Sequence, residues 1–169
     1  PSYAFRIKGI DEMRDTLQAE RYMKEPRAVQ VLYFYGDSGT GKTRSIFASH
    51  NPEDICRITD YGGKNGTKFD SYHGQPVLVF EEFHSQIPIA AMLNYLDIYP
   101  LQLPARYHDR TACYTTVYIT SNISLDEQYT EVQRSELETW RAFLRRIGCV
   151  REFRRGRPPR EVPLHDKRR

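Results

Sequence analysis

Residues 31–43 have the sequence Val31-Leu32-Tyr33-Phe34-Tyr35-Gly36-Asp37-Ser38-Gly39-Thr40-Gly41-Lys42-Thr43, in which an apolar run passes directly into a glycine-rich turn. The turn fits the phosphate-binding pattern G-x-x-x-x-G-K-[ST] at every fixed position. A buried strand that ends in such a turn and then opens a helix points several backbone N–H groups into one concavity, where phosphate oxygens bind. We therefore predict that residues 36–43 bind a nucleoside triphosphate, with Lys42 neutralising the β- and γ-phosphates and the Thr43 hydroxyl holding Mg²⁺.

Two further apolar runs, 77–80 and 117–119, indicate a parallel sheet. Both contain β-branched residues and neither alternates with polar positions, as expected of strands covered on both faces. Segments 42–49, 89–98 and 137–147 have helical spacing, and Ser135 with Glu138 predicts a capping box before the last of them. Strands that alternate with helices indicate an α/β fold, with a central parallel sheet flanked by helices.

Length and charge divide the chain into one core and two appendages. Its 169 residues, 39% of them hydrophobic, suffice for one α/β domain, which we place at 28–150. Residues 1–27 contain a predicted helix over 11–25, which either docks on the core or belongs to an oligomerisation element. Residues 151–169 hold eight Lys or Arg against three Asp or Glu, and we expect a basic, flexible tail. That tail is either a solvated linker or a grip on nucleic acid phosphates.

Composition also indicates where the protein works. No stretch is long and apolar enough for a membrane span, and no secretory pattern opens the chain, so we expect a soluble, intracellular protein. The three cysteines lack metal-binding spacing and are expected to be reduced structural thiols. Because the first residue is Pro1 rather than Met, the chain can be a piece of a longer polypeptide.

Polar side chains follow the second and third apolar runs. Glu81 and Glu82 end the strand 77–80, where a nucleotide hydrolase needs one carboxylate to hold Mg²⁺ and another to polarise the attacking water. We assign Glu81 to the metal and Glu82 to the water. Asn122 ends the next strand, where its amide can donate to the γ-phosphate or orient the water; the alternative is a capping or turn role.

In their order and spacing, these motifs resemble the superfamily 3 helicase domains of rolling-circle replication initiators, found in small circular single-stranded DNA viruses and related plasmids. The resemblance covers roughly residues 29–148. It rests on GDSGTGKT at 36–43, FDSYHG at 69–74, VLVFEEF at 77–83, YPL at 99–101, YITSN at 118–122 and LRRI at 144–147. Circovirus-like members usually carry two Asp where this chain has Glu81-Glu82, a change that keeps both charges.

The resemblance implies an AAA+-like core in which the strand 117–120 lies between the phosphate-loop strand and the Glu81 strand. It also implies a hexameric ring that binds ATP between neighbours, pulls single-stranded DNA through its channel and opens forked duplex. Strand nicking would then belong to a domain upstream of Pro1. The compartment would be the bacterial cytoplasm if a plasmid encodes the protein, or the host nucleus if a virus does.

The ring that the resemblance implies suggests roles for two basic segments. Arg145 and Arg146 lie outside the apolar stripe of the last helix, so either could face a neighbour as an arginine finger; two solvated arginines are the alternative. Residues 106–110 occupy the position of the family's channel-facing hairpin, where Arg106 would contact DNA phosphates, with Tyr107 and His108 able to stack on bases and Arg110 beside them. The family usually has Lys-Gly at this tip.

Other functional classes account for fewer of these residues. A nucleotide phosphotransferase shares the phosphate loop but leaves Asn122 and the 106–110 segment without a role. A GTP switch would need an N-K-x-D motif, which the sequence lacks. An ATP-gated factor that binds DNA and remodels assemblies without unwinding remains open.

Overall fold

A six-stranded sheet forms the centre of the computed structural model, which describes the backbone of residues 2–164 and the side chains of these residues apart from 2–8 and 11. The sheet has the order β2-β3-β6-β1-β7-β8. Its strands are β1 (Gln30–Tyr35), β2 (Ile55–Ile58), β3 (Val77–Phe80), β6 (Thr116–Ser121), β7 (Cys149–Arg154) and β8 (Arg157–Val162). A separate two-stranded sheet pairs β4 (Gln102–Leu103) with β5 (Arg110–Thr111) in antiparallel fashion.

The first five strands of the sheet are parallel, and β6 lies between β1 and β3. This confirms the predicted position of the 117–120 strand. The register aligns Tyr35 with Ser121 and Phe80 with Ile119, so the carboxyl ends of β1, β3 and β6 meet at one edge of the sheet. Ligands of open α/β sheets bind at that edge.

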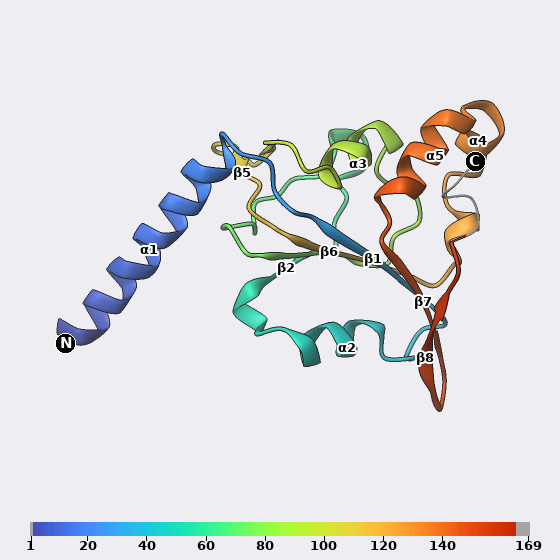
Figure 1. Ribbon diagram of the computed structural model, residues 1–169, viewed down its shortest axis with the longest axis horizontal. Helices are drawn as coiled ribbons and strands as arrows, with labels where there is room; N and C mark the ends of the chain where they lie inside the picture. The colour runs from blue at the N-terminus through green and yellow to red at the C-terminus, as the bar shows by residue number, and fades with distance from the viewer. Residues whose placement is uncertain (1, 165–169) are drawn as a thin grey trace.

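Both faces of the sheet are covered by helices, which explains the uninterrupted apolar runs (Figure 1). One face packs against α2 (Lys42–Ser49), where Leu32 and Phe34 meet Ile46. The other face, which includes Val31 and Tyr33, packs against the remaining helices of the core. These are α3 (Ile89–Tyr95), α4 (Thr130–Ser135) and α5 (Leu137–Arg146), and short 3-10 turns lie at Pro52–Asp54, Gly63–Asn65 and Leu125–Glu127.

Helix boundaries differ from the prediction at two places. The helix expected over 89–98 ends at Tyr95, and the expected capping box before the last helix does not form. Instead, Ser135 ends α4, where its hydroxyl donates to the Glu131 carbonyl over 2.9 Å. A serine bonded back to the preceding turn is not available to cap the next helix.

The N-terminal helix α1 (Ser2–Tyr22) begins earlier than predicted and projects away from the sheet (Figure 1). Among its described side chains Tyr22 is buried, whereas Ile10, Met13 and Leu17 are 58%, 66% and 59% exposed. The helix therefore does not dock these apolar side chains on the core. None of the helices in the described part of the chain is both long and apolar enough to cross a membrane.

The expected flexible tail is wrong for residues 151–162, which form most of a β-hairpin. Strand β7 pairs with β1 and buries Val150 and Phe153, while β8 folds back along its outer side. Few apolar residues suffice to fold this hairpin, because a strand added to an existing sheet is stabilised largely by backbone pairing with that sheet. Residues 165–169 of the predicted tail lie outside the described part.

The β7–β8 hairpin leaves room only for glycine at position 36, the first glycine of the phosphate loop. A Cβ on Gly36 would lie 2.2 Å from the Phe153 carbonyl oxygen, and Gly36 has φ 153°. We predict that Gly36→Ala lowers the free energy of unfolding by about 2–4 kcal/mol, because it combines a backbone clash with backbone strain. Gly63→Ala is the control, since Gly63 has φ 52° with no atom within 4 Å of its Cβ position. It should cost about 1 kcal/mol in urea denaturation, and equal losses for the two variants would contradict the clash.

Candidate active site

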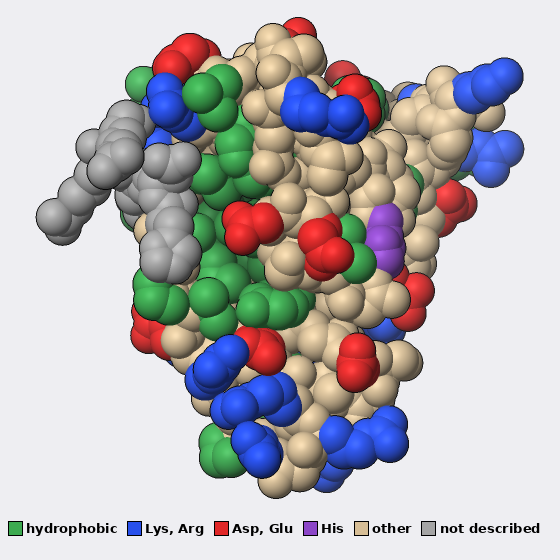
Figure 2. Space-filling view, turned by 90° about the vertical axis from the view of Figure 1, so that its right-hand side faces the viewer, with side chains coloured by type: hydrophobic (Ala, Val, Ile, Leu, Met, Phe, Trp, Pro, Cys, Tyr) green, Lys and Arg blue, Asp and Glu red, His purple; other side chains and the backbone are tan. Residues whose placement is uncertain are grey.

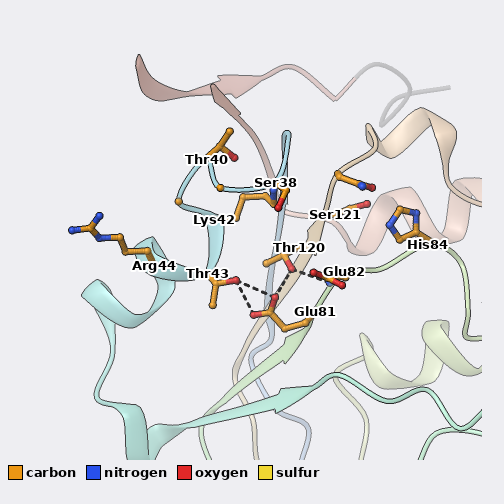
Figure 3. Close-up of a pocket in the computed structure, with 13 residues that line it drawn as sticks. Ser38, Thr40, Lys42, Thr43, Arg44, Glu81, Glu82, His84, Thr120 and Ser121 are labelled. Carbon is orange, nitrogen blue, oxygen red and sulfur yellow. Dashed lines mark hydrogen bonds between the residues drawn. The ribbon is translucent and has the colours of Figure 1, made fainter. Parts of the chain in front are cut away.

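The phosphate loop connects β1 to α2 and is shaped by glycines in the left-handed region. Gly39 has φ 77° and Gly41 has φ 93°, and α2 begins immediately after Gly41, at Lys42. The Lys42 ammonium donates to the carbonyl oxygens of Gly36 at 2.6 Å and Asp37 at 2.9 Å. The lysine thus lies across the concavity of its own loop (Figure 3). Burial lowers the pKa of Lys42, while the carboxylates of Asp37, Glu81 and Glu82 act in the opposite direction.

Glu81 is a buried carboxylate, 6% exposed, held by hydroxyl groups from two elements. Thr43 Oγ1, in the first turn of α2, donates a hydrogen bond shared by the two carboxylate oxygens, each 3.0 Å away. Thr120 Oγ1 on β6 donates to Oε2 at 3.0 Å (Figure 3). Arg57 on β2 completes the set, with its Nε 3.3 Å from Oε1. The carboxylate therefore faces the hydroxyl of the phosphate-loop threonine.

This donor set fits Mg²⁺. The ion prefers hard oxygen ligands and is usually bound by one or two carboxylates together with the phosphates of its nucleotide. Thr43 and Glu81 offer a hydroxyl and a carboxylate at the same point, beside the loop that would hold the phosphates. The residues predicted to hold the metal are thus adjacent in the structure.

Glu82 differs from its neighbour in conformation and exposure. It has φ 49°, its side chain is exposed, and its backbone N–H donates to Thr120 Oγ1 over 3.2 Å. The left-handed backbone turns the chain at this point, so that Glu81 is buried against Thr43 whereas Glu82 is exposed, although both line the same cleft. A single hydroxyl, that of Thr120, contacts both acidic residues.

A cleft of about 390 Å³ brings the predicted residues together. Lys42, Thr43, Glu81, Glu82 and Asn122 all line it, although they come from three segments that are far apart in the sequence: the start of α2 and the ends of β3 and β6. The remaining lining residues are Ser38, Gly39, Thr40, Gly41, Arg44, His84, Thr120 and Ser121. Gly36 and Asp37 lie on the other side of the phosphate loop, where they line a neighbouring hollow.

Sequence reasoning missed three residues that hold Glu81. Thr120 lies within the motif YITSN but has no distinguishing feature there, and Arg57 lies outside the motifs, between the phosphate loop and FDSYHG. Tyr61 donates its hydroxyl to the Glu81 carbonyl oxygen over 2.5 Å. Only the pairing of β3 with its two neighbours reveals that these residues approach the acid, because Phe80 aligns with Ile58 of β2 and with Ile119 of β6.

A buried glutamine supports the loop that follows the acids. Gln128 is fully buried, and its amide nitrogen donates to the Phe83 carbonyl at 2.8 Å and to Tyr33 Oη at 3.0 Å. Its amide oxygen accepts from Ser85 Oγ at 2.6 Å, and Ser85 Oγ in turn accepts the backbone N–H of Tyr129. This network joins the segment after Glu82 to the segment that leads into α4.

The two candidate arginine fingers differ in their surroundings, and neither lines the cleft. Arg146 is bound within its own chain: Nη2 lies 3.0 Å from Asp97 Oδ2, and its other nitrogens donate to the carbonyls of Leu93 and Ala142. Arg145, its neighbour in the last turn of α5, is exposed. The expectation that both arginines are free to face a neighbour therefore fails for Arg146.

The predicted DNA-contacting residues lie on a hairpin, as expected. Strands β4 and β5 flank residues 104–109, and Tyr107 at the tip is 86% exposed. Arg106 donates its backbone N–H to Asp70 Oδ1 over 2.5 Å, and Arg110 Nη1 lies 3.1 Å from His108 Nε2. Asp70, from the motif FDSYHG, thus anchors the hairpin tip, a role that the sequence did not suggest. None of these residues lines the cleft.

The role of Thr120 can be tested by substitution. We predict that Thr120→Val lowers the free energy of unfolding by about 1–3 kcal/mol, because the buried Glu81 carboxylate loses one of its hydrogen bonds and the Glu82 backbone N–H loses its Thr120 partner. Thr120→Ser keeps the hydroxyl and loses one methyl group, which should cost about 1 kcal/mol or less. Urea denaturation measures both, and a larger loss for the serine variant would contradict the hydrogen-bonding role.

Comparisons with known proteins agree on the family. The family model described as RNA helicase matches residues 32–123. Replication-associated proteins are similar: that of Human associated cyclovirus 1 is 30% identical over 86% of this chain and 50% of its own length. That of Porcine circovirus 1 is 25% identical over 96% of this chain and 49% of its own length. The chain thus spans about half the length of these relatives.

Among solved structures, the S. cerevisiae Hsp104:casein complex in its extended conformation matches 85% of this chain and 33% of its own, at 17% identity and a TM-score of 0.39. This likeness is weak, and the strand order of the sheet describes the fold without it. The matched model covers more than half of the chain, including the phosphate loop, both acidic residues and Asn122. The chain therefore belongs to this helicase family, as a superfamily 3 helicase domain of the kind found in the replication-associated proteins of circoviruses and related single-stranded DNA viruses.

Proposed function

We propose that this chain is an ATP-driven DNA motor, which hydrolyses ATP between the subunits of a hexameric ring to move on single-stranded DNA and unwind duplex. One observation carries the proposal: the Thr43 hydroxyl and the Glu81 carboxylate meet at 3.0 Å beside Lys42, while Glu82 opens into the same cleft. One cleft therefore contains the groups needed to bind phosphates and to activate water.

Each residue of the cleft has a distinct role in this proposal. The backbone N–H groups of residues 36–43 and the Lys42 ammonium bind the phosphate chain of ATP. Thr43 and Glu81 hold Mg²⁺, which when bound neutralises phosphate charge. Glu82 accepts a hydrogen bond from the attacking water and polarises it towards the γ-phosphorus. Asn122 donates its amide N–H to the γ-phosphate, and so distinguishes ATP from ADP.

Arg145 supplies the remaining positive charge from the neighbouring subunit. Charge develops on the transferred phosphoryl oxygens, and an arginine that approaches them from outside stabilises it by about 10³–10⁵ in rate in other nucleotide hydrolases. Arg145 is favoured over Arg146 because Arg146 already binds Asp97 and two carbonyl groups of its own chain. A head-to-tail ring presents Arg145 of one subunit to the cleft of the next.

Two surfaces outside the cleft fit the same assembly. The hairpin tip with Arg106, Tyr107 and His108 offers a cation and exposed rings, the groups that bind phosphates and bases of single-stranded DNA. Helix α1 exposes Ile10, Met13 and Leu17 at helical spacing, which suits packing between copies of the chain. The α1 helix would then help to hold the ring together.

The motor activity is tested with Lys42→Ala. We expect single-stranded DNA to stimulate ATP hydrolysis by the unaltered protein and a forked duplex to be opened, whereas Lys42→Ala should lower turnover by about 10²–10³-fold through loss of phosphate stabilisation. Lys64→Ala, on an exposed turn outside the cleft, is the matched control. Forks that are bound but never opened would favour an assembly factor, and ATP turnover that ignores DNA would argue against a DNA motor.

The finger is tested by mixing variants. Arg145→Ala should abolish most ATP hydrolysis while leaving stability unchanged, because its side chain is exposed. Arg146→Ala should instead lower the free energy of unfolding by about 1–3 kcal/mol, since it removes a partly buried pair with Asp97. Subunits with Arg145→Ala mixed with Lys42→Ala subunits should recover activity at mixed interfaces. A mixture as inactive as its components would contradict catalysis between subunits.

A further inference from the structure

The β7–β8 hairpin lies against the phosphate loop of its own chain. Strand β7 runs parallel to β1, with Leu32 aligned to Cys149 and Tyr35 aligned to Glu152. Where β1 ends and the loop begins, β7 continues, so residues 153–155 run beside the loop (Figure 1). The segment that composition describes as a basic tail is therefore attached to the nucleotide-binding edge of the sheet.

The hairpin is fixed in this position by close packing. The space for a Cβ on Gly36 is filled by the Phe153 carbonyl, and the Phe153 ring packs on Phe34 with centroids 4.9 Å apart. Gly156, with φ 69°, then turns the chain, and Arg154 aligns with Arg157 across the turn. The backbone of the loop therefore packs directly against that of β7 at Gly36 and Phe153.

This arrangement brings one guanidinium group to the phosphate loop. A Cβ on Gly39 would lie 4.0 Å from Arg155 Nη2, and Arg155 together with Arg154 lines a hollow of about 300 Å³. The hollow shares Thr40 and Asn122 with the cleft that contains Lys42 and Glu81, so the two spaces adjoin. Figure 2 shows Lys and Arg side chains gathered at the end of this face where the hairpin lies in Figure 1.

The nearby carboxylates are largely engaged elsewhere. Glu152 binds Arg160, with Nη2 at 2.7 Å and Nε at 2.9 Å, and this contact lowers the pKa of Glu152. Glu127, which also lines the hollow, accepts from the backbone N–H and the hydroxyl of Ser124. Asp37 is the remaining acid of the hollow. Among the side chains that the structure describes, Arg155 has no carboxylate within 4.0 Å.

We propose that Arg155 is a nucleotide-binding residue that acts in its own subunit, by contacting the outward-facing oxygens of the terminal phosphates of ATP bound in the phosphate loop. A guanidinium group binds phosphate through paired hydrogen bonds of fixed geometry, and Arg155 lies on the side of the loop that adjoins Asn122. The site then receives one arginine from its own chain, through the hairpin, in addition to the one proposed from the neighbour. This inference rests on the proposed ATP site.

Calorimetric titration with the slowly hydrolysed analogue ATPγS and Mg²⁺ tests the contact. Arg155→Ala should raise the dissociation constant about tenfold, as expected for one charge-assisted hydrogen-bonded contact, and Arg155→Lys should raise it less. Arg157→Ala is the matched control, because Arg157 is an exposed arginine on the other side of the same turn. It should leave the dissociation constant unchanged. Thermal unfolding of each variant without nucleotide verifies that the fold is retained.

Three results would overturn the proposal. Equal ATPγS affinities for Arg155→Ala and the unaltered protein would show that Arg155 does not contact the nucleotide. Equal losses of ATPγS affinity for Arg155→Ala and Arg157→Ala would show that only the positive charge of the hairpin matters, and not the position of Arg155. If both variants instead bind an oligo-dT strand more weakly and bind ATPγS normally, the hairpin grips nucleic acid. Lys42→Ala tests the ATP site independently of Arg155. Only if Lys42→Ala binds ATPγS as tightly as the unaltered protein does is the proposed ATP site itself contradicted.

Discussion

The buried carboxylate of Glu81 is the point on which the site depends. An ionised carboxylate removed from water costs several kcal/mol unless hydrogen bonds replace its hydration. Thr43, Thr120 and Arg57 provide them, and each comes from a different element: α2, β6 and β2. Satisfying this one group therefore fixes the phosphate-loop helix against the neighbouring strands. The same constraint presents the Thr43 hydroxyl and the carboxylate together, an arrangement of oxygen ligands that suits Mg²⁺.

Strained backbone is concentrated immediately beyond this point. Glu82, Ser85 and Tyr129 have positive φ although none is glycine, and such conformations cost about 1–3 kcal/mol each. The Gln128 network compensates, since Ser85 binds both the Gln128 side chain and the Tyr129 backbone. The left-handed conformation of Glu82 directs its side chain away from the buried Glu81. Two adjacent acidic residues can therefore have different roles. Both acids line the cleft, but Glu81 is buried and Glu82 is exposed.

Much of the fold could be read from local patterns. The runs 31–35, 77–80 and 117–119 are strands because an apolar segment without polar alternation suits a sheet covered on both sides. The phosphate loop was recognisable because its glycines and Lys42 must occupy fixed positions. The hairpin after residue 148 was not recognisable. Its arginines indicate a solvated tail, whereas Val150 and Phe153 bury themselves only because the edge of β1 is there to pair with β7.

The sequence by itself determined the phosphate loop and the acidic pair, which are set by residue type and spacing along the chain. The family resemblance added the position of β6 between β1 and β3 and the hairpin with Arg106. Only the tertiary structure decided which arginine of α5 is free, which residues hold Glu81, and that Arg155 lies beside Gly39. Asp97, Thr120 and Phe153 are separated by tens of residues from the groups they control. Such contacts arise from the register of parallel strands and the packing of helices on them, which no local pattern encodes.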